Sequence, residues 1–418
     1  MSKLLIKNGR VMDPASNLDE VADVFVADGK IVEIGAFEVK EADVEVVDAT
    51  GKLVIPGVID LHVHLRDMEQ MEKETIATGT AAAAAGGVTT ILAMPNTVPR
   101  LDHANVIQRY QKLIEKDAVC HVMMAGAISA HCEGKTLADF EDYPDFGIRF
   151  ITDDGFDVDD ETVLETAFKK AAQLNLIVMV HPEVMWLAPD GVVNEGKVSQ
   201  KLGVPGQPNE KEWKAVERAI RLAEKTGARL HLTHLTTKES VQLVRDAKRK
   251  ADRITCDVTP HHLLLTEEMV LRLGSLAKVN PPLRTEADRQ ALIEGIKDRT
   301  IDCIVTDHAP HEEKDPDLQK AAFGFSGLET FVPAILTELH YRQGMDLMEV
   351  VGLLTAKPAS IAGLPCGRLE PGASADLTII DLNLEKTVDR KKLVSKGKNS
   401  PFHGMKLRGW PIQTVLGG

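Results

Sequence analysis

A long, regular alternation of apolar runs and helical segments constrains this fold more than any other feature. Between residues 53 and 367, eight apolar runs are typical of buried strands, and helical segments separate most of them. The runs are 53–64, 89–96, 119–129, 147–154, 177–182, 229–235, 253–260 and 302–307. The helical segments include 74–86, 160–174, 211–226, 237–251 and 286–298. Because strands that alternate with helices pair in parallel, eight such units predict an α/β fold, a (β/α)8 TIM barrel.

The two chain ends follow a different pattern, in which short strands are joined by tight turns. Asn8-Gly9 and Asp28-Gly29 each stand between apolar runs. Both pairs predict a hairpin, because their residues tolerate the positive φ of a type I′ turn. Short strands return at 375–381 and 413–416, so we expect both ends to meet in one small β domain. The predicted segments are 1–52 and 368–418 for that domain and 53–367 for the barrel.

Charge and cysteine content restrict the partners and the compartment. The 418 residues carry a net charge of −14 without a basic stripe, which argues against nucleic acid as a partner. The five cysteines are scattered, without a Cys-x-x-Cys pair, as in reduced cytoplasmic proteins. No apolar stretch approaches the ~18 residues of a membrane span, and the N-terminal apolar stretch is too short for a signal peptide. We therefore predict a cytoplasmic protein with a small-molecule substrate and no contact with a membrane.

The end of the first predicted barrel strand carries a pair of histidines. His62 and His64 lie two residues apart, so on a strand their side chains share a face. Two converging imidazoles suit one transition-metal ion such as zinc. Arg66 continues the alternation and would meet an anionic substrate beside the metal. The alternative is a chance His-x-His in a loop, and the ends of the other strands argue against it.

Barrel enzymes build their sites at the C-terminal ends of the strands, where this chain repeatedly places polar residues. Those residues are His62, His64, Asn96, Asp153, Asp154, His181, His234 and Asp307. Four histidines and two carboxylates can hold two metal ions, with one carboxylate bridging them. Strand alternation does not choose between Asp153 and Asp154 as the bridge, and Asp307 alone would also suit a helix cap. His234 lies nearer the end of its strand than His231 and is the better candidate ligand.

Several motifs together resemble the class I dihydroorotases of the amidohydrolase superfamily. The matching stretches are Asp60-Leu61-His62-Val63-His64-Leu65-Arg66, Met94-Pro95-Asn96-Thr97, Thr152-Asp153-Asp154-Gly155, Asn280-Pro281-Pro282-Leu283-Arg284 and Thr306-Asp307-His308-Ala309-Pro310-His311. The resemblance spans nearly the whole chain. It implies zinc-dependent, reversible cyclisation of N-carbamoyl-L-aspartate to L-dihydroorotate in pyrimidine biosynthesis. One departure is His181-Pro182-Glu183, where the family more often has Cys or Ala in the middle, but the histidine itself is kept.

The resemblance also implies roles for individual residues. One zinc ion would be held by His62, His64 and Asp307, and the other by His181 and His234, with Asp154 as the bridge. The substrate contacts implied are Arg66, Asn96 and His311 for the carboxylate, Asn280 for a ring edge, and Phe323 and Gly324 for a backbone contact to the ring. Asp307 would also take a proton from the attacking hydroxide and pass it to the leaving amide nitrogen.

Two alternatives compete with this interpretation. A hydantoinase or allantoinase is the nearest rival enzyme, but relatives of that kind bridge their metals with a carboxylated lysine, and no lysine lies between Lys135 and Lys169. A non-catalytic subunit that scaffolds aspartate transcarbamoylase would have lost ligands, and none is lost. The sequence leaves open whether each chain holds one or two zinc ions. It also leaves open a homodimer and an association with aspartate transcarbamoylase.

Overall fold

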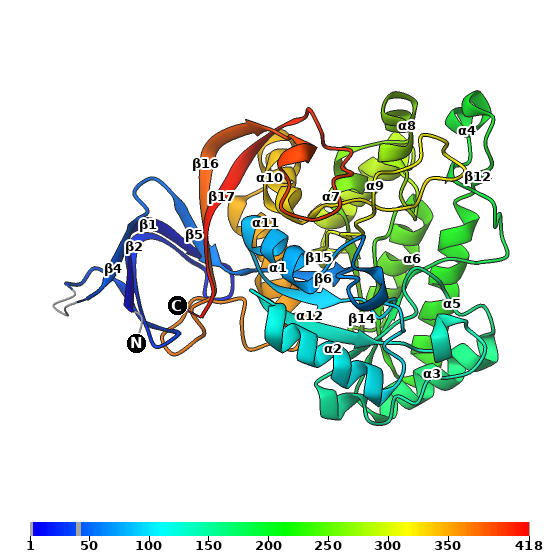
Figure 1. Cartoon of the computed structure of the whole chain (residues 1–418), viewed down its shortest axis with the longest axis horizontal. Coiled ribbons are helices and arrows are strands. Elements are labelled where there is room, and N and C mark those ends of the chain that lie inside the picture. Colours follow the sequence, from blue (N-terminus) through cyan, green and yellow to red (C-terminus); the bar gives the residue numbers. More distant parts are fainter. Residues whose placement is uncertain (1–2, 39–42, 418) are drawn as a thin grey trace.

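A barrel of eight parallel strands forms the body of the molecule (Figure 1). The computed structural model describes residues 3–38 and 43–417. The barrel strands are β6 (Val58–Val63), β7 (Val88–Ala93), β8 (His121–Gly126), β9 (Phe150–Ile151), β10 (Ile177–Val180), β13 (Arg229–Leu232), β14 (Ile254–Val258) and β15 (Cys303–Ile304). A parallel bridge between Val63 and His308 joins the last strand to the first. This order confirms the predicted (β/α)8 barrel.

Helices cover the outside of the barrel. The longer ones are α1 (Ile76–Ala85), α2 (Ala104–Asp117), α3 (Glu161–Gln173), α5 (Glu210–Thr226), α6 (Lys238–Lys248), α9 (Glu286–Lys297) and α11 (Leu347–Leu354). In α3, the side chain of Asp160 caps the first turn by accepting the amides of Thr162 and Val163. Leu164, Ala167, Phe168 and Ala171 recur every three or four residues and form the buried face of that helix.

Shorter elements lie in the loops between the barrel strands and after the last one. They are α4 (Lys197–Leu202), α7 (Pro260–Leu264), α8 (Glu268–Leu273), α10 (Phe331–Ile335), α12 (Ala356–Ala362) and a ribbon of β11 (Val193–Asn194) with β12 (Gly206–Gln207). Across the described part of the chain, we find no helix with both the length and the apolar character needed to cross a bilayer.

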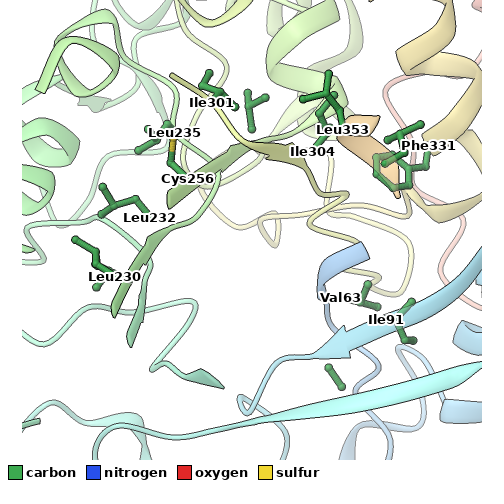
Figure 2. Packing of buried hydrophobic residues seen from close by; sticks show 14 of the residues in the cluster. Val63, Ile91, Leu230, Leu232, Leu235, Cys256, Ile301, Ile304, Phe331 and Leu353 are labelled. Carbon is green, nitrogen blue, oxygen red and sulfur yellow. The ribbon is translucent and has the colours of Figure 1, made fainter. Parts of the chain in front are cut away.

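Apolar side chains fill both faces of the barrel strands. On β10, Val178 and Val180 pack outward against the helices, whereas Ile177 and Met179 belong to a second buried cluster on the opposite face. The outer cluster continues around the barrel through side chains such as Leu230, Cys256 and Ile304 (Figure 2). This two-sided burial explains why the strands appear in the sequence as continuous apolar runs.

The two ends of the chain share a second, smaller sheet beside the barrel (Figure 1). Its strands are β1 (Lys3–Asp13), β2 (Leu18–Ala27), β3 (Lys30–Gly35), β4 (Glu45–Asp48), β5 (Leu53–Pro56), β16 (Leu377–Thr387) and β17 (Lys406–Val415). Strand β16 pairs antiparallel with both β5 and β17, so the C-terminal strands extend a sheet that the N-terminal strands begin. The division into domains at 1–52, 53–367 and 368–418 stays a prediction, which limited proteolysis would test.

Two predictions about local structure need correction or refinement. The hairpin at Asp28-Gly29 is present, with φ angles of 52° and 77°, but Asn8-Gly9 makes no turn. Strand β1 runs straight through that pair, and Asn8, at φ 58°, lies in a β-bulge opposite β2. The prediction was wrong because the same tolerance of positive φ serves a bulge as well as a turn.

The apolar run at 53–64 is two strands with different partners. Strand β5 pairs in the small sheet, whereas β6 is the first strand of the barrel. Gly57 separates them, and a Cβ atom at that position would lie 2.1 Å from the Thr89 hydroxyl oxygen. Glycine at this position lets the chain pass closely against β7 as it enters the barrel.

Candidate metal centre

Six buried side chains from five strand ends converge at the C-terminal mouth of the barrel. They are His62 and His64 from β6, Asp154 after β9, His181 after β10, His234 after β13 and Asp307 after β15. The carboxylate of Asp154 lies at the centre. Its oxygens are 3.2 Å from His62 Nε2, 3.3 Å from His64 Nε2, 3.5 Å from His181 Nδ1 and 3.6 Å from His234 Nε2. Asp307 Oδ1 is 3.3 Å from His64 Nε2.

The spacing of these atoms defines two overlapping groups that could each hold a cation. One group is His62, His64 and Asp307, and the other is His62, Asp154 and His234; within each, the ligand atoms lie within 4.8 Å of one another. His181 Nδ1 lies 2.9 Å from His234 Nε2 and so extends the second group. Asp154 is the member of its pair that faces the histidines. Asp153 turns away and accepts the backbone amides of Ile128 and Ser129.

The donor atoms fit a metal ion because several lone pairs have no protein partner. His62 Nε2 and Asp154 Oδ1 are both fully buried, and neither makes a hydrogen bond. An unpaired buried polar atom is costly, and a cation between these two atoms would satisfy both. Imidazole nitrogens with carboxylate oxygens are ligands typical of transition metals. The residue types of these ligands and their unpaired lone pairs therefore indicate a metal site.

Neighbouring side chains determine which nitrogen of two histidines faces the centre. His64 Nδ1 lies 2.8 Å from Asn96 Oδ1, and the Asn96 amide nitrogen donates to the Asp154 carbonyl at 3.0 Å. The amide oxygen can only accept, so Nδ1 of His64 carries the proton and Nε2 is free to bind a metal. His181 Nε2 donates to Glu183 Oε2 at 2.8 Å in the same way, which leaves Nδ1 of His181 facing Asp154.

The carboxylates and histidines of the centre shift one another's pKa values. Burial alone would raise the pKa of the Asp154 carboxyl, but the neighbouring imidazoles of His62, His181 and His234 hold it well below its usual value. Burial likewise opposes ionisation of Asp307, yet His64 and His62 lower the pKa of that carboxyl. Both acids are therefore anionic at neutral pH, and the two carboxylates attract a cation to the centre.

The centre opens into a small polar cavity of about 130 Å³. Its lining is His64, Arg66, Asn96, Asp154, Gly155, His181, His234, Asn280, Asp307, Ala309, Phe323 and Gly324. Ten of the twelve site residues predicted from the sequence are in this lining. The two outside the lining contact residues within it: His62 Nε2 lies 3.2 Å from Asp154 Oδ1, and His311 Nε2 lies 3.4 Å from Arg66 Nη2. Pockets for drug-sized ligands measure about 300–1,000 Å³, so this smaller cavity suits a molecule smaller than those ligands.

Arg66 reaches this cavity from an unusual backbone segment. Arg66, Asp67 and Met68 have φ angles of 56°, 62° and 50°. Residues other than glycine seldom adopt positive φ angles, and here three do so in succession. The carboxylate of Asp67 stabilises the turn by accepting the amides of Met68 and Ile76. Burial lowers the pKa of Arg66 to about 10, so the guanidinium stays charged at neutral pH, and its Nε has no partner. Strain held in this way is typical of functional sites.

Comparison with known proteins agrees with this geometry. A family model described as Dihydro-orotase-like matches residues 51–240. A dihydroorotase from Pelotomaculum thermopropionicum is 46% identical over 100% of this chain and 97% of its own length. A dihydroorotase from Bacillus cytotoxicus is 44% identical over 99% of this chain and 97% of its own length. The chain belongs to the dihydroorotase family. The predicted resemblance to that family is therefore confirmed.

A solved structure extends the likeness to the wider group of cyclic amide hydrolases. The L-hydantoinase (dihydropyrimidinase) from Arthrobacter aurescens superimposes with a TM-score of 0.89 at 27% identity, covering 100% of this chain and 95% of the hydantoinase. The dihydroorotase family member described here thus shares its barrel, and its small sheet, with hydantoinases. The fold alone does not separate the two activities.

Two predicted substrate contacts already have protein partners. Asn280 donates to Glu183 Oε2 at 2.9 Å and accepts from Gln207 at 3.1 Å. The backbone amide of Gly324 donates to the Lys278 carbonyl at 3.1 Å. Gly324 has φ 97°, and a Cβ atom there would lie 2.5 Å from the Cβ of Ala309, which explains the glycine. Both residues still line the cavity, so their roles toward a substrate remain predictions.

The structure adds supporting residues that sequence reasoning missed. Glu183 holds His181 and is itself paired with Lys211, at 2.5 Å between Glu183 Oε1 and Lys211 Nζ. Thr233 and Asp257 lie beneath His62 and His234. The motif around His181 offered a signal for Glu183, because the glutamate follows two residues later. Thr233 and Asp257 occupy ordinary strand positions, and nothing in their local sequence marks them.

A larger cavity, about 720 Å³, lies away from these residues, beside β7 and β8. Its lining includes Leu364, Pro365, Cys366 and the ion pair of His121 with Asp376. None of the six candidate ligands lines this cavity. It lies beside His121 at the start of β8, on the N-terminal face of the barrel, where residues usually contribute to stability rather than to catalysis. Size alone therefore does not identify the functional site.

Proposed function

We propose that this protein is a zinc-dependent dihydroorotase, which interconverts N-carbamoyl-L-aspartate and L-dihydroorotate in pyrimidine biosynthesis. One observation carries the proposal: the Asp154 carboxylate lies within 3.6 Å of four imidazoles, and its Oδ1 has no hydrogen-bond partner. Five of the six candidate ligands line the same cavity as Arg66. The names of the full-length relatives support the choice of substrate.

The proposed ligands divide between two zinc ions. His62, His64 and Asp307 would hold one ion, His181 and His234 would hold the other, and Asp154 would be a ligand shared by both. Imidazoles and carboxylates are typical zinc ligands. When bound, the ions supply Lewis acidity, which lowers the pKa of water and polarises a ring carbonyl.

Side chains of the protein carry the remaining chemistry. Asp307 accepts the proton released by the attacking water and returns it to the ring nitrogen as the carbon–nitrogen bond breaks. Cyclisation reverses these steps, with the proton leaving the carbamoyl nitrogen and water departing. Arg66 binds the substrate carboxylate through a forked pair of hydrogen bonds, assisted by Asn96 and His311. Asn280 and the Phe323-Gly324 segment contact the edge of the ring.

Hydantoinase activity is the second candidate, because a hydantoinase shares the fold at a TM-score of 0.89. The central position argues for dihydroorotase. It is filled by the aspartate Asp154, and no lysine occurs between Lys135 and Lys169 to provide a carboxylated bridge.

A substrate comparison on one zinc-analysed preparation tests the proposal. We expect one or two zinc ions per chain and hydrolysis of L-dihydroorotate, with little turnover of hydantoin or allantoin. The metal-free protein, prepared with a chelator and then reloaded with zinc, is the control. Hydantoin turnover without dihydroorotate turnover would favour the second candidate. Zinc content without turnover of any of these substrates would favour a scaffolding subunit.

Three further properties belong to the same proposal. We propose a cytoplasmic enzyme that acts on a small molecule, either as a homodimer or together with aspartate transcarbamoylase. Size-exclusion chromatography of the purified chain, alone and mixed with aspartate transcarbamoylase, distinguishes these assemblies. Cell fractionation tests the compartment.

A further inference from the structure

A fully buried carboxylate lies directly beneath the candidate metal centre. We infer that Asp257, on β14, is a positioning residue that orients ligands of both proposed metal ions. Its Oδ1 accepts the backbone amide of His234 at 2.5 Å, and its two oxygens each lie 3.2 Å from the Thr233 hydroxyl. Its Oδ2 also accepts from His231 Nε2 at 2.8 Å. The inference rests on the proposed function, because it concerns the ligands of that metal centre.

The Thr233 hydroxyl connects Asp257 to His62. His62 Nδ1 lies 2.8 Å from Thr233 Oγ1. A hydroxyl has one proton, and the Thr233 hydroxyl donates it to Asp257, whose two oxygens each lie 3.2 Å away. The threonine oxygen must then accept from Nδ1–H of His62. The Nε2 of His62 is left with its lone pair facing Asp154, in the tautomer that a metal requires.

The same carboxylate holds the backbone of His234 in a strained conformation. His234 has φ 41°, in the left-handed region that a histidine seldom adopts, and this conformation turns its side chain toward Asp154. The amide of His234 is buried and donates to Asp257. Without that acceptor the amide would be left unpaired, and the strained turn would lose a hydrogen bond that stabilises it. Asp257 therefore affects His62 through a threonine hydroxyl and His234 through its backbone.

Cobalt titration of the metal-free protein measures this role without reference to turnover. Ligand-field absorption of bound Co²⁺ gives the number of sites and their affinities. We expect Thr233→Val, which removes only the hydroxyl, to weaken the site that contains His62 by about 10- to 100-fold. We expect Asp257→Asn to weaken both sites by at least that factor. Thr233→Ser should restore the affinity of the unmodified protein, because the serine hydroxyl can make the same two hydrogen bonds.

Thr255→Val is the matched control. Thr255 lies on the same strand as Asp257, and its hydroxyl bonds to His231 Nδ1 at 2.8 Å but to none of the proposed ligands. This variant should bind cobalt as the unmodified protein does. Thermal unfolding of each metal-free variant separates a weakened site from a damaged fold, and Thr233→Val still tests the inference if Asp257→Asn does not fold.

The possible outcomes separate this inference from the proposed function. If folded Thr233→Val and Asp257→Asn bind cobalt with unchanged affinity and spectrum, the positioning role is overturned while the metal centre stands. If the unmodified protein binds no cobalt, the metal centre is refuted and the positioning role with it. Weakened binding in Thr255→Val equal to that in Thr233→Val would also overturn the inference, because any hydroxyl beneath the site would then matter equally.

Discussion

This barrel contains two layers of buried residues of the types that bind metals, one beneath the other. Only the upper layer has atoms free to bind a metal. The upper layer contains the groups of His62, His64, Asp154, His234 and Asp307, and the lower layer is His231, Asp257 and Cys303. Both layers are buried, and within each group of three residues the ligand atoms lie within 4.8 Å of one another. In the upper layer, His62 Nε2 and Asp154 Oδ1 have no hydrogen-bond partner. In the lower layer, both nitrogens of His231 and both oxygens of Asp257 are hydrogen-bonded.

The difference teaches that residue type and spacing do not define a metal site unless lone pairs are free. Burial also raises the pKa of the Cys303 thiol well above its usual value, so the thiol stays protonated and is a poor ligand. The lower layer instead uses its acceptors to support the upper layer.

The largest expected effect comes from Asp154→Asn, which should leave the upper layer, like the lower one, unable to bind a metal. The amide removes the charge and one oxygen from the point where four imidazoles meet. We expect loss of bound zinc and a fall in dihydroorotate turnover of roughly 10³-fold or more, since Lewis-acid catalysis contributes several kcal/mol. Zinc analysis and turnover on one preparation check this. Asp153→Asn is the control and should keep its zinc, because Asp153 faces Ile128 and Ser129.

Asp307→Asn should separate metal binding from proton transfer within the upper layer. The amide keeps the shape and one oxygen ligand but is a poor proton acceptor at neutral pH. We expect bound zinc with turnover lowered by about two or more orders of magnitude, the usual size of a general acid–base contribution. Near-normal turnover with full zinc would contradict the proton-transfer role, and the helix-cap alternative predicts that result, because Asn caps as well as Asp.

Arg66→Ala tests the part of the cavity that lies outside both metal groups. Hydrogen bonds to a charged group contribute about 1.5–3 kcal/mol, so we expect the KM for dihydroorotate to rise about 10- to 100-fold while zinc is retained. Steady-state kinetics with zinc analysis measure both quantities. Arg66→Lys is the control and should recover only part of the loss, because an ammonium lacks the fork. An unchanged KM in Arg66→Ala would exclude the carboxylate role.

Cys303→Ala should have the smallest effect on function. It tests whether the lower layer contributes a metal ligand. Removing a buried thiol should lower the free energy of unfolding by roughly 1 kcal/mol. Zinc content and turnover should stay as in the unmodified protein, because the thiol is not a ligand. Denaturant unfolding and metal analysis check these two expectations. A loss of zinc in this variant would show that the lower layer binds metal after all.

Sequence patterns predicted the barrel because most barrel strands are buried on both faces and are followed by a periodic helix, β8 being the exception on both counts. The candidate site was also predictable, since the topology brings strand ends together wherever they lie in the chain. The patterns did not choose Asp154 over Asp153, because the choice depends on a turn after the very short strand β9. They did not reveal Thr233 or Asp257, whose importance comes from contacts across strands. The bulge at Asn8-Gly9 was missed because its residues also suit a turn.

The strand order of the small sheet has a consequence for synthesis on the ribosome. Strand β5 borders β1 on one side and β16 on the other, and β16 begins at Leu377, after every residue that faces the metal centre. Until β16 emerges, the apolar edge Leu53-Val54-Ile55 has no partner on that side, and unpaired edges promote aggregation. A nascent chain released before Leu377 would contain every residue that lines the cavity, but the edge of β5 just before the first barrel strand would stay unpaired.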